Sequence, residues 1–167
     1  MALSDVSNIL WRERRLVELL GFKLEEEQLI FAAGRNRWLA HARREVESVV
    51  GEIKRVELEW AVHVAHAGDE LGIADAPTLR DLASLTPTPW DGIFADHRRA
   101  LLALAQEIDA ITKSNREMSQ RGHGTTRGRS GETGEIDIDQ YDAYGAYDGQ
   151  AVLPDRSLVL RIVDETI

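Results

Sequence analysis

Apolar side chains recur at alternating intervals of four and three residues between Trp90 and Met118. This spacing predicts a helix that presents one narrow apolar seam to partner helices. A Thr-Pro pair at 88–89 is typical of a helix start, and Gly122 marks the expected end. A helix of about 30 residues is about 45 Å long and is not stable alone in water, so the rest of the chain must supply partners. The seam positions are Trp90, Phe94, His97, Leu101, Leu104, Ile108, Ile111, Asn115 and Met118.

Two further helical patterns precede this stretch, at residues 3–33 and 36–67. The first repeats its apolar residues every seven positions, with acidic interruptions at Glu13 and Glu27. A Gly-Asn break with a one-residue slip of the apolar phase separates the two patterns, which favours a hairpin over a continuous rod. The second seam consists of Leu39, Ala42, Val46, Val49, Ile53, Val56, Trp60, His63 and Ala67.

The connection from residue 68 to 89 is rich in Gly and Pro, and a capped pattern within it predicts a short helix. Three long helices with one close turn and one longer loop predict an all-α fold, an antiparallel three-helix coiled-coil bundle. We place this helical bundle at residues 1–121. Its helices are expected at about 3–33, 36–67, 78–85 and 89–121.

Residues 122–167 differ in composition from the rest of the chain. They begin with a Gly-, Arg-, Ser- and Thr-rich stretch typical of a flexible linker, and they carry 4 basic and 9 acidic residues. Residues 158–163 form a β-prone apolar patch with no evident partner strand. Because so little apolar surface cannot offset the entropy of ordering, we expect a flexible acidic tail that is largely disordered.

The composition of the 167-residue chain excludes several classes of protein. A net charge of −9 argues against nucleic-acid binding, which needs a basic surface. The absence of cysteine excludes a disulfide framework and fits a reducing cytoplasm. Neither a signal peptide nor a membrane-spanning apolar run is evident. We expect a cytoplasmic protein without stable membrane insertion, either a monomer or a homodimer.

The histidines are the main candidates for chemistry, because no phosphate loop, dinucleotide fingerprint, zinc signature or nucleophile elbow is present. His63 and His66 lie one helical turn apart, and an antiparallel neighbour could bring His97 close to them. A three-ligand metal site, and with it a metal-dependent helical-bundle enzyme, is therefore conceivable. The simpler interpretation is that His63 and His97 fill seam positions, since no Glu-x-x-His pair accompanies them. We expect no enzyme activity, no bound metal and no cofactor.

Three kinds of polar or aromatic residue have two interpretations each. Asn115 lies in a seam, where it either binds a partner backbone or fixes helix register. Trp11 and Trp38 fall just off their seams and either widen the core, which we favour, or mark an apolar patch for a partner. A tyrosine triplet in the tail is either a chance cluster or a docking peptide. Its members are Tyr141, Tyr144 and Tyr147.

Six short motifs follow one another along nearly the whole chain. They are Phe-Ala-Ala-Gly at 31–34, Leu-Gly at 71–72, Thr-Leu-Arg-Asp-Leu at 78–82, Pro-Trp at 89–90, a segment with an Asn at 111–118, and a Tyr-x-x-x-Gly-like tract at 144–150. Their order resembles the FlgN-type flagellar export chaperones.

The resemblance implies a cytoplasmic chaperone without catalysis. Such proteins bind the C-terminal segments of hook-associated proteins, also called hook–filament junction proteins, prevent their premature assembly and deliver them to the flagellar type III export gate. A long bundle with an interrupted seam could also accept an amphipathic client helix in a groove. We expect gate docking at Tyr141, Tyr144 and Tyr147. We expect client binding at Leu101, Leu104, Ile108, Ile111, Asn115 and Met118.

Two alternatives from other classes remain. The first is the metal-dependent enzyme at His63, His66 and His97. The second is a generic coiled-coil adaptor or a small secreted helical-hairpin effector, against which the third long helix and the tail argue.

Overall fold

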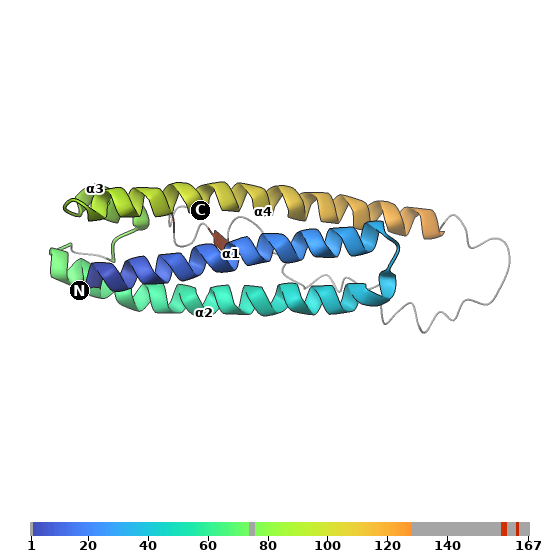
Figure 1. Ribbon diagram of the computed structural model, residues 1–167, viewed down its shortest axis with the longest axis horizontal. Helices are drawn as coiled ribbons and strands as arrows, with labels where there is room; N and C mark the ends of the chain where they lie inside the picture. The colour runs from blue at the N-terminus through green and yellow to red at the C-terminus, as the bar shows by residue number, and fades with distance from the viewer. Residues whose placement is uncertain (1, 74–75, 128–157, 160–162, 164–167) are drawn as a thin grey trace.

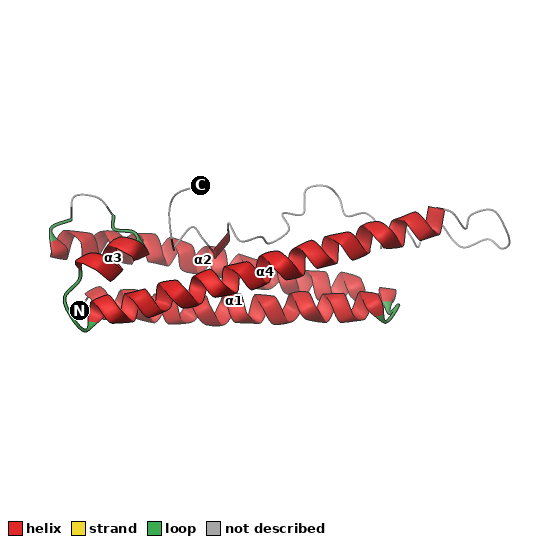
Figure 2. Cartoon of the chain, turned by 90° about the horizontal axis from the view of Figure 1, so that it is seen from above, coloured by secondary structure: helices red, strands yellow, loops and turns green. Residues whose placement is uncertain are grey.

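The computed structural model describes residues 2–73, 76–127, 158–159 and 163 (Figures 1 and 2). All regular elements within these residues are helical, which confirms the predicted all-α class. None of the described helices combines the length and apolar composition needed to cross a membrane. Residues 128–157, most of the expected flexible tail, lie outside the described part. The elements are α1 (Ala2–Ala32), the 3-10 helix η1 (Asn36–Trp38), α2 (Leu39–Leu71), α3 (Leu79–Leu85) and α4 (Trp90–Arg127).

The three long helices lie side by side along the long axis of the molecule (Figure 1). α1 and α2 run in opposite directions through a close turn, and α4 runs in the same direction as α1 (Figure 1). α1 packs against both α2 and α4, whereas α2 and α4 make at most marginal contact with each other. Among the described helices α1 therefore packs against both other long helices, and the finer prediction of an antiparallel three-helix coiled-coil bundle stays a prediction.

Glycines with positive φ end both helices of the α1–α2 hairpin. At the end of α1, Gly34 has φ 65°, and the amide of Arg35 donates to the carbonyl of Ile30 at 3.0 Å. At the end of α2, Gly72 has φ 71°, and the amide of Ile73 donates to the carbonyl of Gly68 at 3.0 Å. Both are Schellman motifs, in which glycine adopts the left-handed conformation without the steric cost of a Cβ.

The two later helices begin close to the predicted residues. Thr78 caps α3 in a reciprocal box, because its hydroxyl accepts from the Asp81 amide at 3.1 Å while the Asp81 carboxylate accepts from the Thr78 amide at 3.0 Å. α4 begins at Trp90 and continues to Arg127, beyond its predicted end at Gly122. A glycine inside a helix costs only about 1 kcal/mol, so Gly122 alone does not stop it.

The buried residues of α2 match the predicted seam up to Trp60 and again at Ala67, but not at His63. The next buried residue is Val64, and His63 is exposed instead. Two successive steps of four, from Val56 to Trp60 and from Trp60 to Val64, act as a stutter in the heptad pattern. The sequence alone did not distinguish the two residues, because a step of three from Trp60 reaches His63 and a step of four reaches Val64, and both steps are compatible with a helix.

A short C-terminal segment completes the core. Leu158, Val159 and Val163 have helical backbone, are buried, and belong to the same apolar cluster as the three long helices. We call these three residues the C-terminal apolar turn. They were expected to lie in a β-prone patch of a disordered tail, and that expectation is wrong for these residues. The turn lies alongside the long helices (Figures 1 and 2), and its buried residues share one apolar cluster with residues of α1, α2 and α4.

Candidate functional site

The six residues expected to bind a client lie between Leu101 and Met118 of α4, but they differ in accessibility. Leu101 and Ile108 are fully buried in the core cluster. Leu104 and Ile111 are only partly buried and pack on its edge. Asn115 and Met118 line a small pocket closer to the end of the helix. Part of the predicted surface thus packs inside the molecule, and part remains accessible.

The period of an undistorted helix explains this division. The buried row of α4 advances by 18 residues in five steps, which is the 3.6 residues per turn of a straight α-helix. The predicted seam assumed 3.5 residues per turn and therefore drifts off the buried row. Leu104 and Ile111 consequently lie on a flank, and Ala105 and Thr112 take the buried places. The buried row consists of Phe94, His97, Leu101, Ala105, Ile108 and Thr112.

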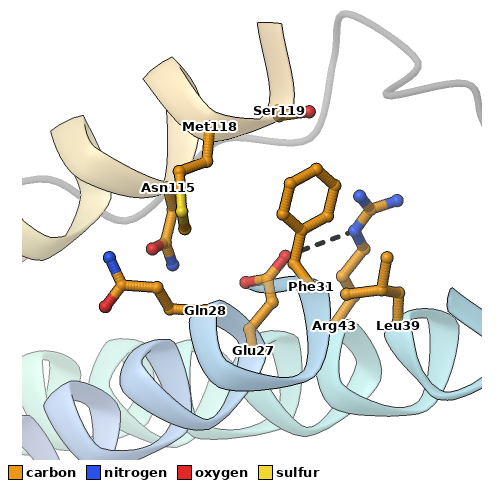
Figure 3. Close-up of a pocket in the computed structure, with 8 residues that line it drawn as sticks. All are labelled: Glu27, Gln28, Phe31, Leu39, Arg43, Asn115, Met118 and Ser119. Atoms are coloured by element: carbon orange, nitrogen blue, oxygen red, sulfur yellow. Dashed lines mark hydrogen bonds and ion pairs between the residues drawn. The ribbon is translucent and has the colours of Figure 1, made fainter. Parts of the chain in front are cut away.

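The pocket forms where α1, α2 and α4 converge near the hairpin turn (Figure 3). The Nδ2 of Asn115 donates to the Leu24 carbonyl at 2.9 Å, which fixes α4 against α1. The Oδ1 of Asn115 has no hydrogen-bond partner among the described residues. Asn115 was expected either to bind a partner backbone or to fix helix register, and its bond to α1 is a contact between helices of this chain. The pocket is lined by Glu27, Gln28, Phe31, Leu39, Arg43, Asn115, Met118 and Ser119.

The two acidic interruptions of the first seam are buried. Arg43 of α2 donates to Glu27 at 3.3 Å, and burial raises the pKa of Glu27 while the charge of Arg43 opposes the rise. Glu13 is 0 % exposed, and neither carboxylate oxygen has a hydrogen-bond partner among the described residues. Burial raises the pKa of Glu13 to about 8, and the negative charge of Glu57 adds to the rise. Glu13 is therefore largely protonated at neutral pH, as an uncompensated buried carboxylate requires.

The three histidines considered for a metal site are in different environments. His97 is buried, with its Nε2 3.3 Å from the Ser7 hydroxyl and its ring edge-on to Trp11 at 5.0 Å between centroids. Burial lowers the pKa of His97 to about 4, with a further contribution from the charge of Arg14. His63 and His66 are exposed on α2. No group of three metal-ligating side chains occurs in the part of the chain that the structure describes.

The outer face of α1 carries large apolar side chains, of which only Trp11 was considered for an apolar surface patch. Phe22 is 60 % exposed, and Leu29 is more exposed still. Trp11 and Trp38 are about half exposed (49 and 50 %), so the expectation that they widen the core is wrong. Trp11, Phe22 and Leu29 are separated by 11 and 7 residues, which places them on one side of the helix. We missed this surface in the sequence because the heptad pattern was used only to assign the buried side of the helix.

The tyrosine triplet, expected to dock to the export gate, lies outside the described residues. The structure also brings a segment to the helices that we had not assigned to any site, the C-terminal apolar turn. Its signal in the sequence was the apolar run at 158–163, whose short length did not distinguish a strand from a helical turn.

Comparison with known proteins gives one result. The sequence model of the FlgN family, described as FlgN protein, matches residues 1–129, more than half of the chain. No curated protein and no solved structure matches the chain. The family match spans α1 to α4 and ends before the C-terminal apolar turn. The chain therefore belongs to the FlgN family, a family of flagellar chaperones.

Proposed function

We propose that this chain is a cytoplasmic export chaperone for hook-associated proteins of the hook–filament junction. It binds their C-terminal helical segments, prevents premature assembly and delivers them to the flagellar type III export gate. Family membership supports the chaperone role. The identity of the client follows from the resemblance of the six motifs to those of the FlgN-type chaperones.

The proposed client surface is the C-terminal part of α4. The single observation that carries it is an apolar flank at intervals of seven residues, Leu104, Ile111 and Met118, none of which is fully buried. Asn115 lies at the same end of α4, where its Nδ2 donates to the Leu24 carbonyl and holds this part of the surface against α1. Leu101 and Ile108 pack in the core beneath this flank, so they support the surface. An amphipathic client helix would lay its apolar residues along the flank.

Replacing Leu104 and Ile111 together by Asp is expected to weaken client binding at least about tenfold. Two charges on an apolar contact must be desolvated, and each loss of about 1.4 kcal/mol in binding free energy is a factor of ten in affinity. Calorimetric titration measures the effect, with a synthetic C-terminal peptide of a junction protein from the same genome. Circular dichroism checks that the variant keeps its helicity.

Two control variants locate the contact. Leu58 is 71 % exposed on α2, so Leu58→Asp makes the same chemical change away from α4 and should leave affinity unchanged. Phe22→Asp tests the outer face of α1 as a competing surface. Loss of binding in Phe22→Asp, with full affinity in the Leu104→Asp/Ile111→Asp variant, would move the client site from α4 to α1.

We further propose that Tyr141, Tyr144 and Tyr147 dock the loaded chaperone to the export gate. Aromatic rings bring a large contact area at low entropic cost. Replacing all three by Ala is expected to leave client affinity unchanged and to lower export of the client, measured as secreted protein in culture medium. The matched Tyr→Phe triple variant retains the rings and should export more than the Ala variant. Equal export by the wild-type and Ala chains would exclude this role.

A further inference from the structure

The outer face of α1 carries a second heptad pattern, on a different side of the helix from its buried residues. Six positions at alternating intervals of four and three residues are all exposed. Such intervals keep side chains on one side of a helix over several turns, as they do at the contact positions of a coiled coil. The pattern therefore has the spacing of a helix–helix contact. Its members, which we call the outer α1 stripe, are Trp11, Arg15, Glu18, Phe22, Glu25 and Leu29.

Half of the outer α1 stripe is large and apolar. Trp11 is 49 % exposed, Phe22 60 % and Leu29 70 %. Covering these side chains with a partner is favourable by about 25 cal/mol for each Å² of apolar surface removed from water. The glutamates between them argue against a lipid surface as that partner, because helices that lie on membranes carry basic polar faces. The stripe therefore fits another protein helix.

The charges of the stripe change sign along the helix. Arg15 lies in its N-terminal half and Glu25 in its C-terminal half, and neither forms an ion pair with another described residue. A helix that is basic toward one end and acidic toward the other is complementary to a copy of itself running in the opposite direction. The charge pattern thus points to a second copy of this chain as the partner.

An antiparallel second copy of α1 satisfies both the charged and the apolar positions. Arg15 lies opposite Glu25 of the second copy in this arrangement, and Trp11 lies opposite its Leu29. Each pairing occurs twice, because the two-fold axis of a dimer makes the contact reciprocal. Parallel helices would instead place every stripe residue opposite itself, with arginine against arginine and glutamate against glutamate, which is unfavourable.

The apolar residues also select the register of the two helices. With Arg15 opposite Glu25, all three large apolar residues of the stripe face the second copy, and Phe22 lies opposite Glu18. A shift by one heptad would leave Leu29, the most exposed of the three, opposite the polar Ser4. The register with Arg15 opposite Glu25 therefore covers more of the exposed apolar surface.

We propose that the outer α1 stripe is the contact of a symmetric homodimer, in which the α1 helices of two copies pack antiparallel with Arg15 of each copy against Glu25 of the other. The dimer does not depend on the proposed function, since its contact lies on α1 and the proposed client surface lies on α4. A contact limited to one helix of each copy is at the small end of specific interfaces. Monomer and dimer should therefore exchange at micromolar concentrations.

Sedimentation equilibrium of the full chain over the micromolar range tests the self-association. The average mass of the wild type should rise toward twice the monomer mass with concentration. Leu29→Asp should weaken the dimer at least about tenfold, because it places a charge against Trp11 in both symmetric contacts. The matched control is Leu58→Asp, the same change at a residue 71 % exposed on α2, which should dimerise like the wild type.

Reversal of single charges tests the direction and the register. Arg15→Glu and Glu25→Arg each create like-charge contacts twice in the dimer and should each weaken it at least about tenfold. A chain with both substitutions restores opposite charges and should dimerise like the wild type. An equimolar mixture of the two single variants should form a heterodimer, because the glutamates of one chain face the arginines of the other.

Three results would overturn the proposal. The first is a wild type that remains monomeric throughout the concentration range, and the second is equal weakening by Leu29→Asp and Leu58→Asp. The third is recovery of the dimer by Arg15→Glu with Glu18→Arg, but not by Arg15→Glu with Glu25→Arg, which would contradict the register. Circular dichroism should show unchanged helicity, because all substituted residues are exposed. If Leu29→Asp loses helicity, Leu29→Ala replaces it and should still weaken the dimer.

Discussion

Glu13→Gln is expected to raise the free energy of unfolding at pH 8 by about 4 kcal/mol, because one pKa unit corresponds to about 1.36 kcal/mol. The pKa of Glu13 rises from 4.5 to about 8 on folding, mainly through burial. Between these values the unfolded chain loses a proton that the folded chain keeps, so stability falls as the pH rises. Gln has no proton to lose, and the variant should escape this fall.

Urea unfolding followed by circular dichroism at pH 5 and pH 8 measures the effect. At pH 5 the wild-type carboxyl is protonated in the folded state and mostly charged only when unfolded, so the gain should be no more than about 1 kcal/mol. Glu18→Gln, at an exposed position of the same helix, should change stability by less than about 0.5 kcal/mol at either pH. An equal gain from Glu13→Gln at both pH values would show that Glu13 is not buried as a neutral acid.

Ile108→Ala is expected to destabilise the fold by about 3 kcal/mol, within the range for removing a large aliphatic side chain from a core. Ile108 is 1 % exposed, and its Cδ1 lies 3.7 Å from where a Cβ on Gly21 would stand, so α1 and α4 approach closely here. The truncation leaves a cavity that the two helices cannot easily close.

Ile111→Ala is the matched control, since Ile111 is one turn away and only partly buried. Its cost should be about 1 kcal/mol, because less apolar area is withdrawn from water in the wild type. Urea midpoints of the two variants provide the comparison. Similar losses would contradict the distinction between a buried row and an accessible flank on α4, on which the proposed client surface depends.

The helices were predictable because apolar periodicity and glycine punctuation act locally. Gly34 and Gly72 end α1 and α2 in left-handed turns, and the Thr78–Asp81 box begins α3. The finer register was not predictable. A seam of 3.5 residues per turn and one of 3.6 agree for two or three turns and then differ. For this reason Leu104 was predicted to lie in the buried seam, whereas Ala105 is the residue that is buried.

The buried acids needed tertiary information. Glu13 and Glu27 lay at seam positions and were regarded as interruptions, yet both are buried. Glu27 has Arg43 of α2 as its partner, and Glu13 has a pKa of about 8. Neither partner nor pKa can be derived from one helix alone, because both depend on how α2 packs against α1.

The C-terminal apolar turn was the least predictable part of the core. The run at 158–163 was noticed, but an isolated apolar hexamer does not reveal where it docks. Its burial depends on the apolar cluster that α1, α2 and α4 form together. The candidate client surface and the turn therefore became visible only with all helices in place.

Light scattering coupled to size-exclusion chromatography tests the chaperone function most directly. The full chain should form a stoichiometric complex with a purified junction protein from the same genome, and deletion of that protein's C-terminal helical segment should abolish the complex. Separate elution of the two full-length proteins at micromolar concentration, with both folded by circular dichroism, would contradict the proposed function.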